Sequence, residues 1–201
     1  MELDKIKAFA FDIDGVATEG TLLCMPDGDF LRLYDAKDGF AIRMACMNGY
    51  PVAVITGGSS ESIRKRMTAS GIKPEDVFLH CRDKMVEFGQ FCARYNLLPE
   101  EVMYFGDDIP DVEVMEACGC GVCPADAVPE AREAADWITT SPGGKGCLRE
   151  AIEQTLKLQG KWVFDPVVYK QRFWADGPAR QARHPGQQFS KKEGTAVGAR
   201  Y

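Results

Sequence analysis

The sequence contains no long apolar segment. No uninterrupted apolar run approaches the roughly 18 residues that a membrane-spanning helix needs, so we expect neither a membrane span nor a membrane partner. The N-terminal stretch MELDKIKAFAF carries Glu2 and Asp4, and it lacks the basic-then-apolar layout and the small-residue cleavage site of a signal peptide. We therefore expect a cytoplasmic protein.

Histidine is also scarce, and acidic residues outnumber basic ones. The two histidines, His80 and His184, have no nucleophile or base partner in view, so we expect both to be structural. The formal net charge is −6, which argues against nucleic acid as a general partner. The 201 residues are 45% hydrophobic, which is enough for one ordinary domain with its own core.

Cysteine is present, but its placement argues against disulfides and zinc. Most of the eight cysteines lie within apolar runs of a chain that is not a small secreted domain, so we expect buried thiols. Cys118, Cys120 and Cys123 lie close together, yet no second pair follows at a spacing typical of zinc sites. We therefore expect no metal at these cysteines.

Short apolar runs alternate with longer amphipathic segments through the first 160 residues. This alternation predicts an α/β fold, a Rossmann-like doubly wound parallel sheet with helices on both faces. Strands are expected at Ala8–Phe11, Val52–Ile55, Val77–Leu79, Val102–Phe105, Cys120–Cys123 and Trp137–Thr139. Helices are expected near Gly39–Asn48, Ser59–Ser70, Asp83–Tyr95, Pro110–Ala117, Pro129–Ala134 and Lys145–Lys157.

Two segments depart from this alternation. Between Thr21 and Tyr34, the runs TLLCM and FLRLY flank the turn sequence PDGD, which predicts a β-hairpin projecting from the carboxyl edge of the first strand. Residues 161–201 hold eight Lys/Arg against three Asp/Glu, a local charge of +5, whereas the first 160 residues hold −11. We expect a domain over residues 1–160 and a basic tail over 161–201.

Polar residues gather at the carboxyl ends of the expected strands, where ligands bind in such folds. They are Asp12 and Asp14; Thr56, Gly57, Gly58 and Ser59; Lys84; and Gly106, Asp107, Asp108 and Asp111. Several carboxylates on one rim repel one another, and a hard divalent cation with oxygen ligands, such as Mg²⁺, relieves that repulsion. A hydroxyl, glycine amides and a lysine beside the metal suit a phosphate group.

The same residues resemble a known superfamily. The segments DIDGV, ITGG, Lys84 and GDDIPD match in order the four motifs of the haloacid dehalogenase (HAD) phosphohydrolases. Over about residues 5–162 the chain resembles the 3-deoxy-D-manno-octulosonate 8-phosphate (KDO 8-phosphate) phosphatases, through segments such as KDGFAIRMA and SPGGKGCLREAIEQTLKLQGKW. The hairpin then stands where larger relatives insert a cap domain.

The resemblance implies a two-step phosphatase mechanism. It implies that Asp12 attacks phosphorus to form an aspartyl phosphate and that Asp14 protonates the leaving oxygen and later activates water. It implies a Mg²⁺ ion held by Asp12, the backbone carbonyl of Asp14, and Asp107. Asp108 and Asp111 would take supporting positions around the metal.

The resemblance also implies the residues that bind phosphate. Thr56 and Lys84 would bind the phosphoryl oxygens and offset charge in the transition state. Gly57 and Gly58 would let backbone amides approach the phosphate, and Ser59 would lie beside them.

Four positions bear on the substrate. Many members of the family carry arginine, and relatives acting on nine-carbon 2-keto acids an acidic residue, where this chain has Gly58. Arg64 and Arg66, on the following helix, could meet a sugar carboxylate or could form a solvated face. Lys145, in the turn PGGKG, matches a basic position that the family uses near substrate, with an ordinary loop as the alternative.

The resemblance therefore implies a Mg²⁺-dependent KDO 8-phosphate phosphatase of lipopolysaccharide biosynthesis. One alternative is a phosphatase for a nine-carbon 2-keto-3-deoxy sugar acid 9-phosphate, and another is a non-catalytic module that keeps the fold. The resemblance implies a homotetramer in which a neighbouring subunit completes each site. The aromatic stretch from Trp162 to Trp174 would pack on the tetramer and the last residues would help to cover a site, unless the tail is a disordered extension.

Overall fold

Short apolar runs form the strands of one parallel sheet in the computed structural model, which describes residues 2–173. The sheet has six strands in the order β5-β4-β1-β6-β7-β8. They are β1 (Ala8–Phe11), β4 (Val52–Ile55), β5 (Val77–Phe78), β6 (Val102–Phe105), β7 (Cys120–Cys123) and β8 (Trp137–Ile138). The predicted α/β fold and the place of each expected strand are confirmed.

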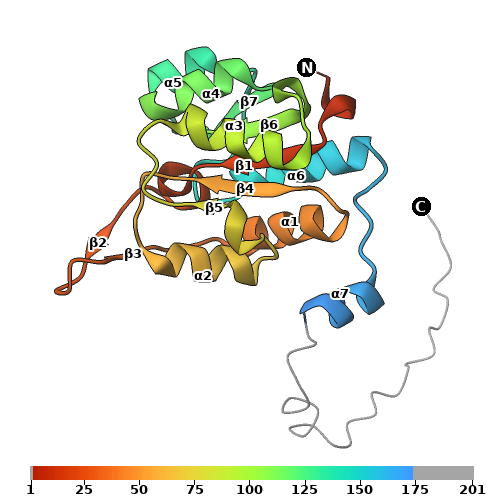
Figure 1. Ribbon diagram of the computed structural model, residues 1–201, viewed down its shortest axis with the longest axis horizontal. Helices are drawn as coiled ribbons and strands as arrows, with labels where there is room; N and C mark the ends of the chain where they lie inside the picture. The colour runs from red at the N-terminus through yellow and green to blue at the C-terminus, as the bar shows by residue number, and fades with distance from the viewer. Residues whose placement is uncertain (1, 174–201) are drawn as a thin grey trace, which may run out of the picture. The chain divides into compact units, whose positions relative to one another are not determined.

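Helices cover both faces of the sheet, which explains why the central strands are apolar on both sides. Figure 1 shows α1 (Ala36–Met47) and α2 (Glu61–Ala69) on one face, and α3 (Lys84–Tyr95), α4 (Val112–Ala117) and α5 (Pro129–Ala134) on the other. Helix α6 (Cys147–Leu158) packs on the same face as α1. The alternating side chains of β1 divide accordingly, since Phe9 and Phe11 join one core cluster and Ala8 and Ala10 the other.

The register of the central strands places the polar residues that follow them at one edge. Phe11 is the partner of Val54 in β4 and of Phe105 in β6. The residues just beyond these three strands therefore emerge side by side, at the carboxyl edge of the sheet.

The helix starts depend on local caps. Helix α1 begins at Ala36 rather than near Gly39, because the carboxylate of Asp35 accepts hydrogen bonds from the amides of Lys37 and Asp38. Helix α6 begins at Cys147 rather than at Lys145, because Gly146 has a φ of +111°, outside the helical region.

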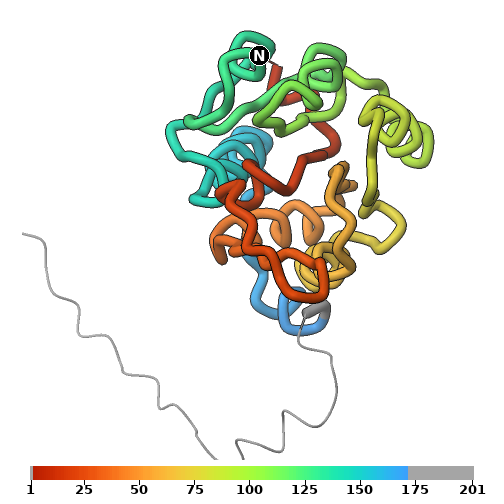
Figure 2. Tube along the Cα trace, turned by 90° about the vertical axis from the view of Figure 1, so that its left-hand side faces the viewer, coloured from red at the N-terminus to blue at the C-terminus, as the bar shows by residue number. Residues whose placement is uncertain are grey.

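The predicted hairpin is confirmed, although each of its strands is only two residues long. Strand β2 (Leu23–Cys24) pairs antiparallel with β3 (Phe30–Leu31). Gly28 has a φ of +86° in the turn between them. Figure 1 shows the hairpin extending from the carboxyl edge of the sheet, and Figure 2, viewed toward that edge, shows it in front, next to α2.

The chain divides after Phe164 into two units. Within the first unit, the Arg149 guanidinium lies 4.7 Å from the centre of the Trp162 ring, and the Phe40 ring meets Trp162 edge-on at 6.3 Å. In the second unit, Asp165 caps helix α7 (Pro166–Phe173) by accepting hydrogen bonds from the first turn. The tail expected beyond residue 173 lies outside the described residues.

Across residues 2–173, none of the helices has the length and apolar character needed to cross a bilayer. No disulfide forms within this part of the chain, which includes all eight cysteines. Cys120 and Cys123 are buried in β7, in agreement with the expectation of buried thiols.

Candidate active site

Asp12 begins the loop that follows β1. Its amide donates to the carbonyl of Phe105 at 3.0 Å, and its carboxylate accepts from the amide of Ile13 at 2.6 Å. The loop then turns through Gly15, whose φ is +93°. A Cβ at this position would lie 1.9 Å from Oδ2 of Asp107, so only glycine allows this close approach.

Three carboxylates meet at the edge of the sheet. Oxygens of Asp12, Asp107 and Asp111 all lie within 4.8 Å of one another. The Lys84 ammonium lies 2.9 Å from Oδ2 of Asp12 and 2.6 Å from Oδ1 of Asp111. The lysine begins α3 and its side chain is only 6% exposed, so both ion pairs are shielded from water.

The carboxylate of Asp111 is held by several donors. The hydroxyl of Tyr104 donates to Oδ1 at 2.6 Å, and the amide of Asp107 donates to Oδ2 at 3.3 Å. The sequence placed Asp111 in a supporting position but did not identify Tyr104. A tyrosine within a strand expected to be buried was the one signal in the sequence that could have identified Tyr104. A buried hydroxyl needs a hydrogen-bond partner, and the carboxylates at the strand ends could supply one.

Burial shifts the acidity of this cluster. Burial raises the pKa of Asp12 to about 6, against the opposing effect of Lys84. Burial and the charges of Asp111 and Asp12 raise the pKa of Asp107 to about 7. Burial alone would lower the pKa of Lys84, but the two neighbouring carboxylates raise it, so Lys84 remains a cation. The cluster therefore holds more negative charge than one lysine neutralises.

The chemistry of the donor set fits a divalent cation. Oδ1 of Asp107 is buried and has no hydrogen-bond partner among the described residues. A hard cation such as Mg²⁺ prefers carboxylate oxygens and would supply the positive charge that the cluster needs. The residues present thus fit the predicted metal.

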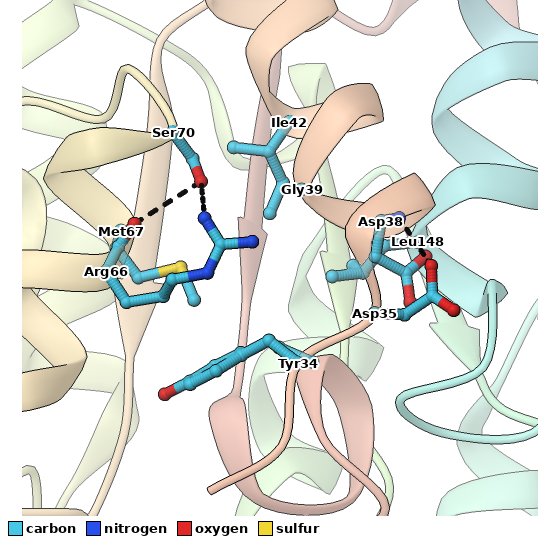
Figure 3. Close-up of a pocket in the computed structure, with 10 residues that line it drawn as sticks. Tyr34, Asp35, Asp38, Gly39, Ile42, Arg66, Met67, Ser70 and Leu148 are labelled. Atoms are coloured by element: carbon cyan, nitrogen blue, oxygen red, sulfur yellow. Dashed lines mark hydrogen bonds between the residues drawn. The ribbon is translucent and has the colours of Figure 1, made fainter.

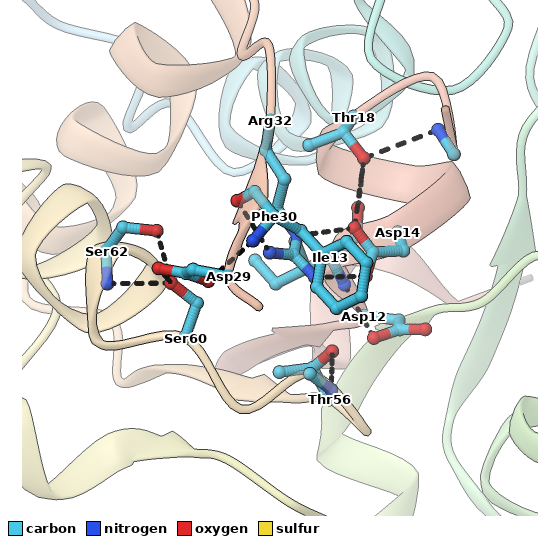
Figure 4. Close-up of polar contacts among 12 residues, drawn as sticks. Asp12, Ile13, Asp14, Thr18, Asp29, Phe30, Arg32, Thr56, Ser60 and Ser62 are labelled. Carbon is cyan, nitrogen blue, oxygen red and sulfur yellow. Dashed lines mark hydrogen bonds and ion pairs between the residues drawn. The ribbon is translucent and has the colours of Figure 1, made fainter. Parts of the chain in front are cut away.

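The loop after β4 brings Thr56 to the same edge. Thr56 is buried, its amide donates to the carbonyl of Phe78 at 3.2 Å, and its carbonyl accepts from Cys81 at 3.0 Å. Figure 4 shows Thr56 below Asp12, with its hydroxyl bonded to the amide of Gly58 at 3.2 Å. Gly57 and Ser59 follow as exposed positions of this loop.

The side chain of Asp14 makes a contact that the sequence did not predict. Arg32, from the hairpin, donates to both oxygens of Asp14, at 2.7 Å from Nε and 2.8 Å from a terminal nitrogen. Figure 4 shows this pair above Asp12. An arginine between two leucines in FLRLY was the only available signal. Asp14 does not join the three-carboxylate cluster through its side chain.

Two further predicted residues lie at the edge in exposed positions. Asp108 caps the turn that follows β6 by accepting from the amide of Ile109 at 2.7 Å. Lys145 forms an ion pair with Glu19 at 3.1 Å, in which both side chains are about half exposed. Its loop packs on the loop after β1, since the amide of Gly144 donates to the carbonyl of Val16 at 2.8 Å.

The structure does not bring Arg64 to this edge. Its guanidinium donates to the carbonyls of Pro74 at 2.6 Å and Val77 at 2.8 Å. Val77 begins β5, so these contacts lie at the opposite end of that strand from the site. Arg64 was a candidate because its helix follows the loop after β4, but the carbonyls of Pro74 and Val77 hold its guanidinium. Arg64 is therefore not part of the site.

Arg66 lies beside a small cavity rather than among the carboxylates. It donates to the hydroxyl of Ser70 at 2.8 Å, and its guanidinium lies 5.6 Å from the centre of the Tyr34 ring (Figure 3). The cavity measures about 10 Å³, which is room for about one water molecule. A second, larger cleft of about 230 Å³ lies next to Lys84. Its wall includes Arg82, Ile109 and Glu113.

Comparisons with known proteins find a matching family and similar phosphatases. The family described as haloacid dehalogenase-like hydrolase matches residues 61–149. The 3-deoxy-D-manno-octulosonate 8-phosphate phosphatase KdsC of Escherichia coli (strain K12) is 33% identical over 158 residues, which cover 79% of this chain and 83% of that protein.

Solved structures of similar proteins share the fold. The cobalt-bound deoxy-D-mannose-octulosonate 8-phosphate phosphatase from Haemophilus influenzae has a TM-score of 0.77 and 32% identity, covering 87% of this chain and 99% of that one. The phosphatase from Moraxella catarrhalis, in complex with magnesium, phosphate and KDO, has a TM-score of 0.76 and 28% identity, covering 80% and 91%.

Three observations lead to one assignment. They are the order of the motifs, the carboxylates at the sheet edge with their buried lysine, and the extent of the similarity. The chain is a phosphoric monoester hydrolase, and it belongs to the 3-deoxy-D-manno-octulosonate 8-phosphate phosphatase family of the haloacid dehalogenase-like hydrolases.

Proposed function

We propose that this chain is a Mg²⁺-dependent phosphatase for KDO 8-phosphate that works through an aspartyl phosphate on Asp12. One observation carries the proposal: Lys84 bridges Asp12 and Asp111 in a buried cluster that also contains Asp107. A purely structural ion pair has no need of a third, partly buried carboxylate with a buried oxygen that no described residue hydrogen-bonds.

In the first step, a carboxylate oxygen of Asp12 attacks phosphorus, and the bond from phosphorus to the sugar oxygen breaks. Asp14 gives its proton to that leaving oxygen. In the second step, a water molecule attacks the aspartyl phosphate while Asp14 takes up the water's proton, which frees phosphate and restores Asp12. Lys84 and the hydroxyl of Thr56 bind the phosphoryl oxygens.

The metal would be held by the carboxylates of Asp12 and Asp107 and by the backbone carbonyl of Asp14. When bound, Mg²⁺ neutralises charge on the phosphoryl group, which lets an anionic carboxylate approach an anionic ester. Asp111 orients Lys84, and Asp108 supports the metal's surroundings from the turn after β6. Gly57, Gly58 and Ser59 offer backbone amides to the phosphate.

The relatives support the choice of substrate, because the similar proteins are named as phosphatases of KDO 8-phosphate. A phosphate-release screen over sugar-acid phosphates, with and without chelator, tests the proposal. We expect the highest kcat/KM on KDO 8-phosphate and loss of activity in chelator. A higher kcat/KM on a nine-carbon 2-keto-3-deoxy sugar acid 9-phosphate would move the assignment to that substrate.

The assembly is a further part of the proposal. The hairpin exposes apolar side chains, with Leu23, Leu31 and Leu33 at 62%, 53% and 80% exposure, and a homotetramer would cover them. Light scattering of the purified protein should give four times the mass of the chain, and Leu33→Asp should lower it. Thiols without disulfides are in keeping with the cytoplasm, which cell fractionation would test.

A further inference from the structure

The hairpin is attached to the site by two polar contacts. Arg32, which follows β3, holds both oxygens of Asp14 in the loop after β1. Asp29, in the hairpin turn, accepts a hydrogen bond at 2.9 Å from the hydroxyl of Ser60, the residue that caps α2. The hairpin is therefore tied to the loops after β1 and β4, which carry the proposed catalytic residues (Figure 4).

The Arg32 side chain is fixed on several sides. It is 3% exposed, whereas Asp14 is 26% exposed. A terminal nitrogen also donates to the carbonyl of Phe30 at 3.4 Å. The hydrogen bonds to Asp14 raise the pKa of Arg32, so it stays a cation. A two-point contact between a buried guanidinium and a carboxylate fixes the orientation of the carboxylate as well as its position.

Gly58 leaves the room that Arg32 needs. A Cβ at position 58 would lie 3.3 Å from a terminal nitrogen of Arg32 and 2.9 Å from Cδ1 of Ile63. A larger side chain at position 58 would therefore press on the guanidinium. The glycine in ITGG, which departs from the pattern of many relatives, and the arginine of the hairpin thus occupy adjoining space.

We propose that Arg32 is a positioning residue that orients Asp14 for proton transfer, and that the hairpin delivers it. This rests on the proposed function, because it takes Asp14 as the acid and base of the reaction. The hydroxyl of Thr18 also lies near Asp14, but it is 3.5 Å from Oδ1. At that distance it is too far away to orient the Asp14 carboxylate by itself. Without Arg32, the Asp14 side chain would be free to turn away from the leaving oxygen.

The role of Asp14 predicts a dependence on the leaving group. A sugar alkoxide is a poor leaving group and needs a proton from Asp14, whereas p-nitrophenolate leaves without one. The value of kcat/KM reports the steps up to the transfer of phosphate to Asp12, so it isolates the protonation step from the later hydrolysis. A loss of positioning must therefore lower kcat/KM for the sugar phosphate more than for the aryl phosphate.

The test compares Arg32→Met, Arg32→Lys and the wild type with Mg²⁺, on KDO 8-phosphate and on p-nitrophenyl phosphate. We expect Arg32→Met to lower kcat/KM by about 10- to 100-fold on KDO 8-phosphate and only a few-fold on the aryl ester. Arg32→Lys, which keeps one charged hydrogen bond, should recover part of the loss. The matched control is Arg94→Met, which breaks an ion pair with Asp76 beside the start of β5 and should change both esters equally or not at all.

The outcomes separate the two proposals. Equal losses on both esters, or no loss, in a folded Arg32→Met protein would overturn the positioning role. A wild type that releases no phosphate from either ester would overturn the proposed function instead. If Asp14→Asn lacks the leaving-group dependence that Arg32→Met shows, the assignment of Asp14 fails. If Arg32→Met does not fold, the same comparison made on Arg32→Lys decides, because a lysine loses the two-point contact.

Discussion

Gly15 and Asp107 approach so closely that a Cβ on Gly15 would lie 1.9 Å from Oδ2 of Asp107. These residues come from the loops after β1 and β6, so their contact fixes the distance between two of the strand ends that form the site. A glycine next to Asp14 in DIDGV therefore serves packing as well as the turn.

Gly15→Ala should disrupt the site. The new methyl group must displace the Asp107 carboxylate, and the positive φ adds about 1 to 2 kcal/mol of backbone strain. We expect Mg²⁺ affinity, measured by calorimetry, to fall at least about tenfold, because a metal site tolerates little misplacement of its ligands. Gly28→Ala in the hairpin turn is the control, since its φ is +86° and a Cβ there has nothing within 4 Å. It should show the backbone strain alone; equal Mg²⁺ affinity in the two variants would contradict the packing role.

Asp12→Asn should abolish turnover and keep the fold. An amide cannot form the acyl phosphate, and loss of a nucleophile lowers kcat by about a thousandfold or more. The substitution also removes one negative charge from a crowded cluster, so the thermal midpoint without metal should not fall. Phosphate release and a thermal melt measure the two effects. Activity near that of the wild type would show that another group attacks phosphorus.

Asp111→Ala should be strongly destabilising. It removes one of the two carboxylate partners of the buried Lys84 ammonium. It also removes the carboxylate oxygen that accepts the hydrogen bond from the Tyr104 hydroxyl. Removing one member of a buried ion pair costs about 3 to 5 kcal/mol. Tyr104→Phe removes only one hydrogen bond and should cost about 1 kcal/mol. Urea unfolding measures both free energies, and similar values for the two variants would argue against Lys84 depending on Asp111.

Mg²⁺ binding should weaken as pH falls. The fold raises the pKa of Asp12 to about 6 and that of Asp107 to about 7, from an ordinary carboxyl value of 3.8. A raised carboxyl pKa means that the metal-free fold favours the protonated form. Protonation of these two carboxyls therefore stabilises the metal-free fold relative to the unfolded chain. This stabilisation is complete below about pH 4 and is lost as pH rises through 6 to 7.

Protons and Mg²⁺ thus compete for the same oxygens, and apparent affinity should fall about tenfold per pH unit for each proton displaced. The thermal shift caused by Mg²⁺ should be larger at about pH 8 than at about pH 5.5, and calorimetry in buffers of different ionisation heat should detect proton release on binding. The control is Asp108→Asn, because Asp108 is the exposed residue next to Asp107. This variant should keep the pH dependence of Mg²⁺ binding. A thermal shift that is the same at both pH values would show that neither carboxyl meets the metal.

The sequence alone was enough for the sheet and for most residues of its carboxyl edge. Apolar runs such as Ala8–Phe11 have one favourable place, a strand covered on both faces, and the strands of such a sheet end at a common edge. Asp12, Thr56 and Asp107 could be predicted as neighbours for that reason. The hairpin was also predictable, because PDGD is a turn sequence between two apolar runs.

Only the tertiary structure decided the partners of the long charged side chains. Arg32 lies 18 positions from Asp14 in the sequence, and Arg64 turns to backbone carbonyls at the far end of β5 although its helix begins at the site. Lysine and arginine side chains reach several ångströms through flexible bonds, so their partners depend on which elements pack beside them. Backbone periodicity determines where a strand ends, whereas the charge pairs across loops depend on packing that no local pattern contains.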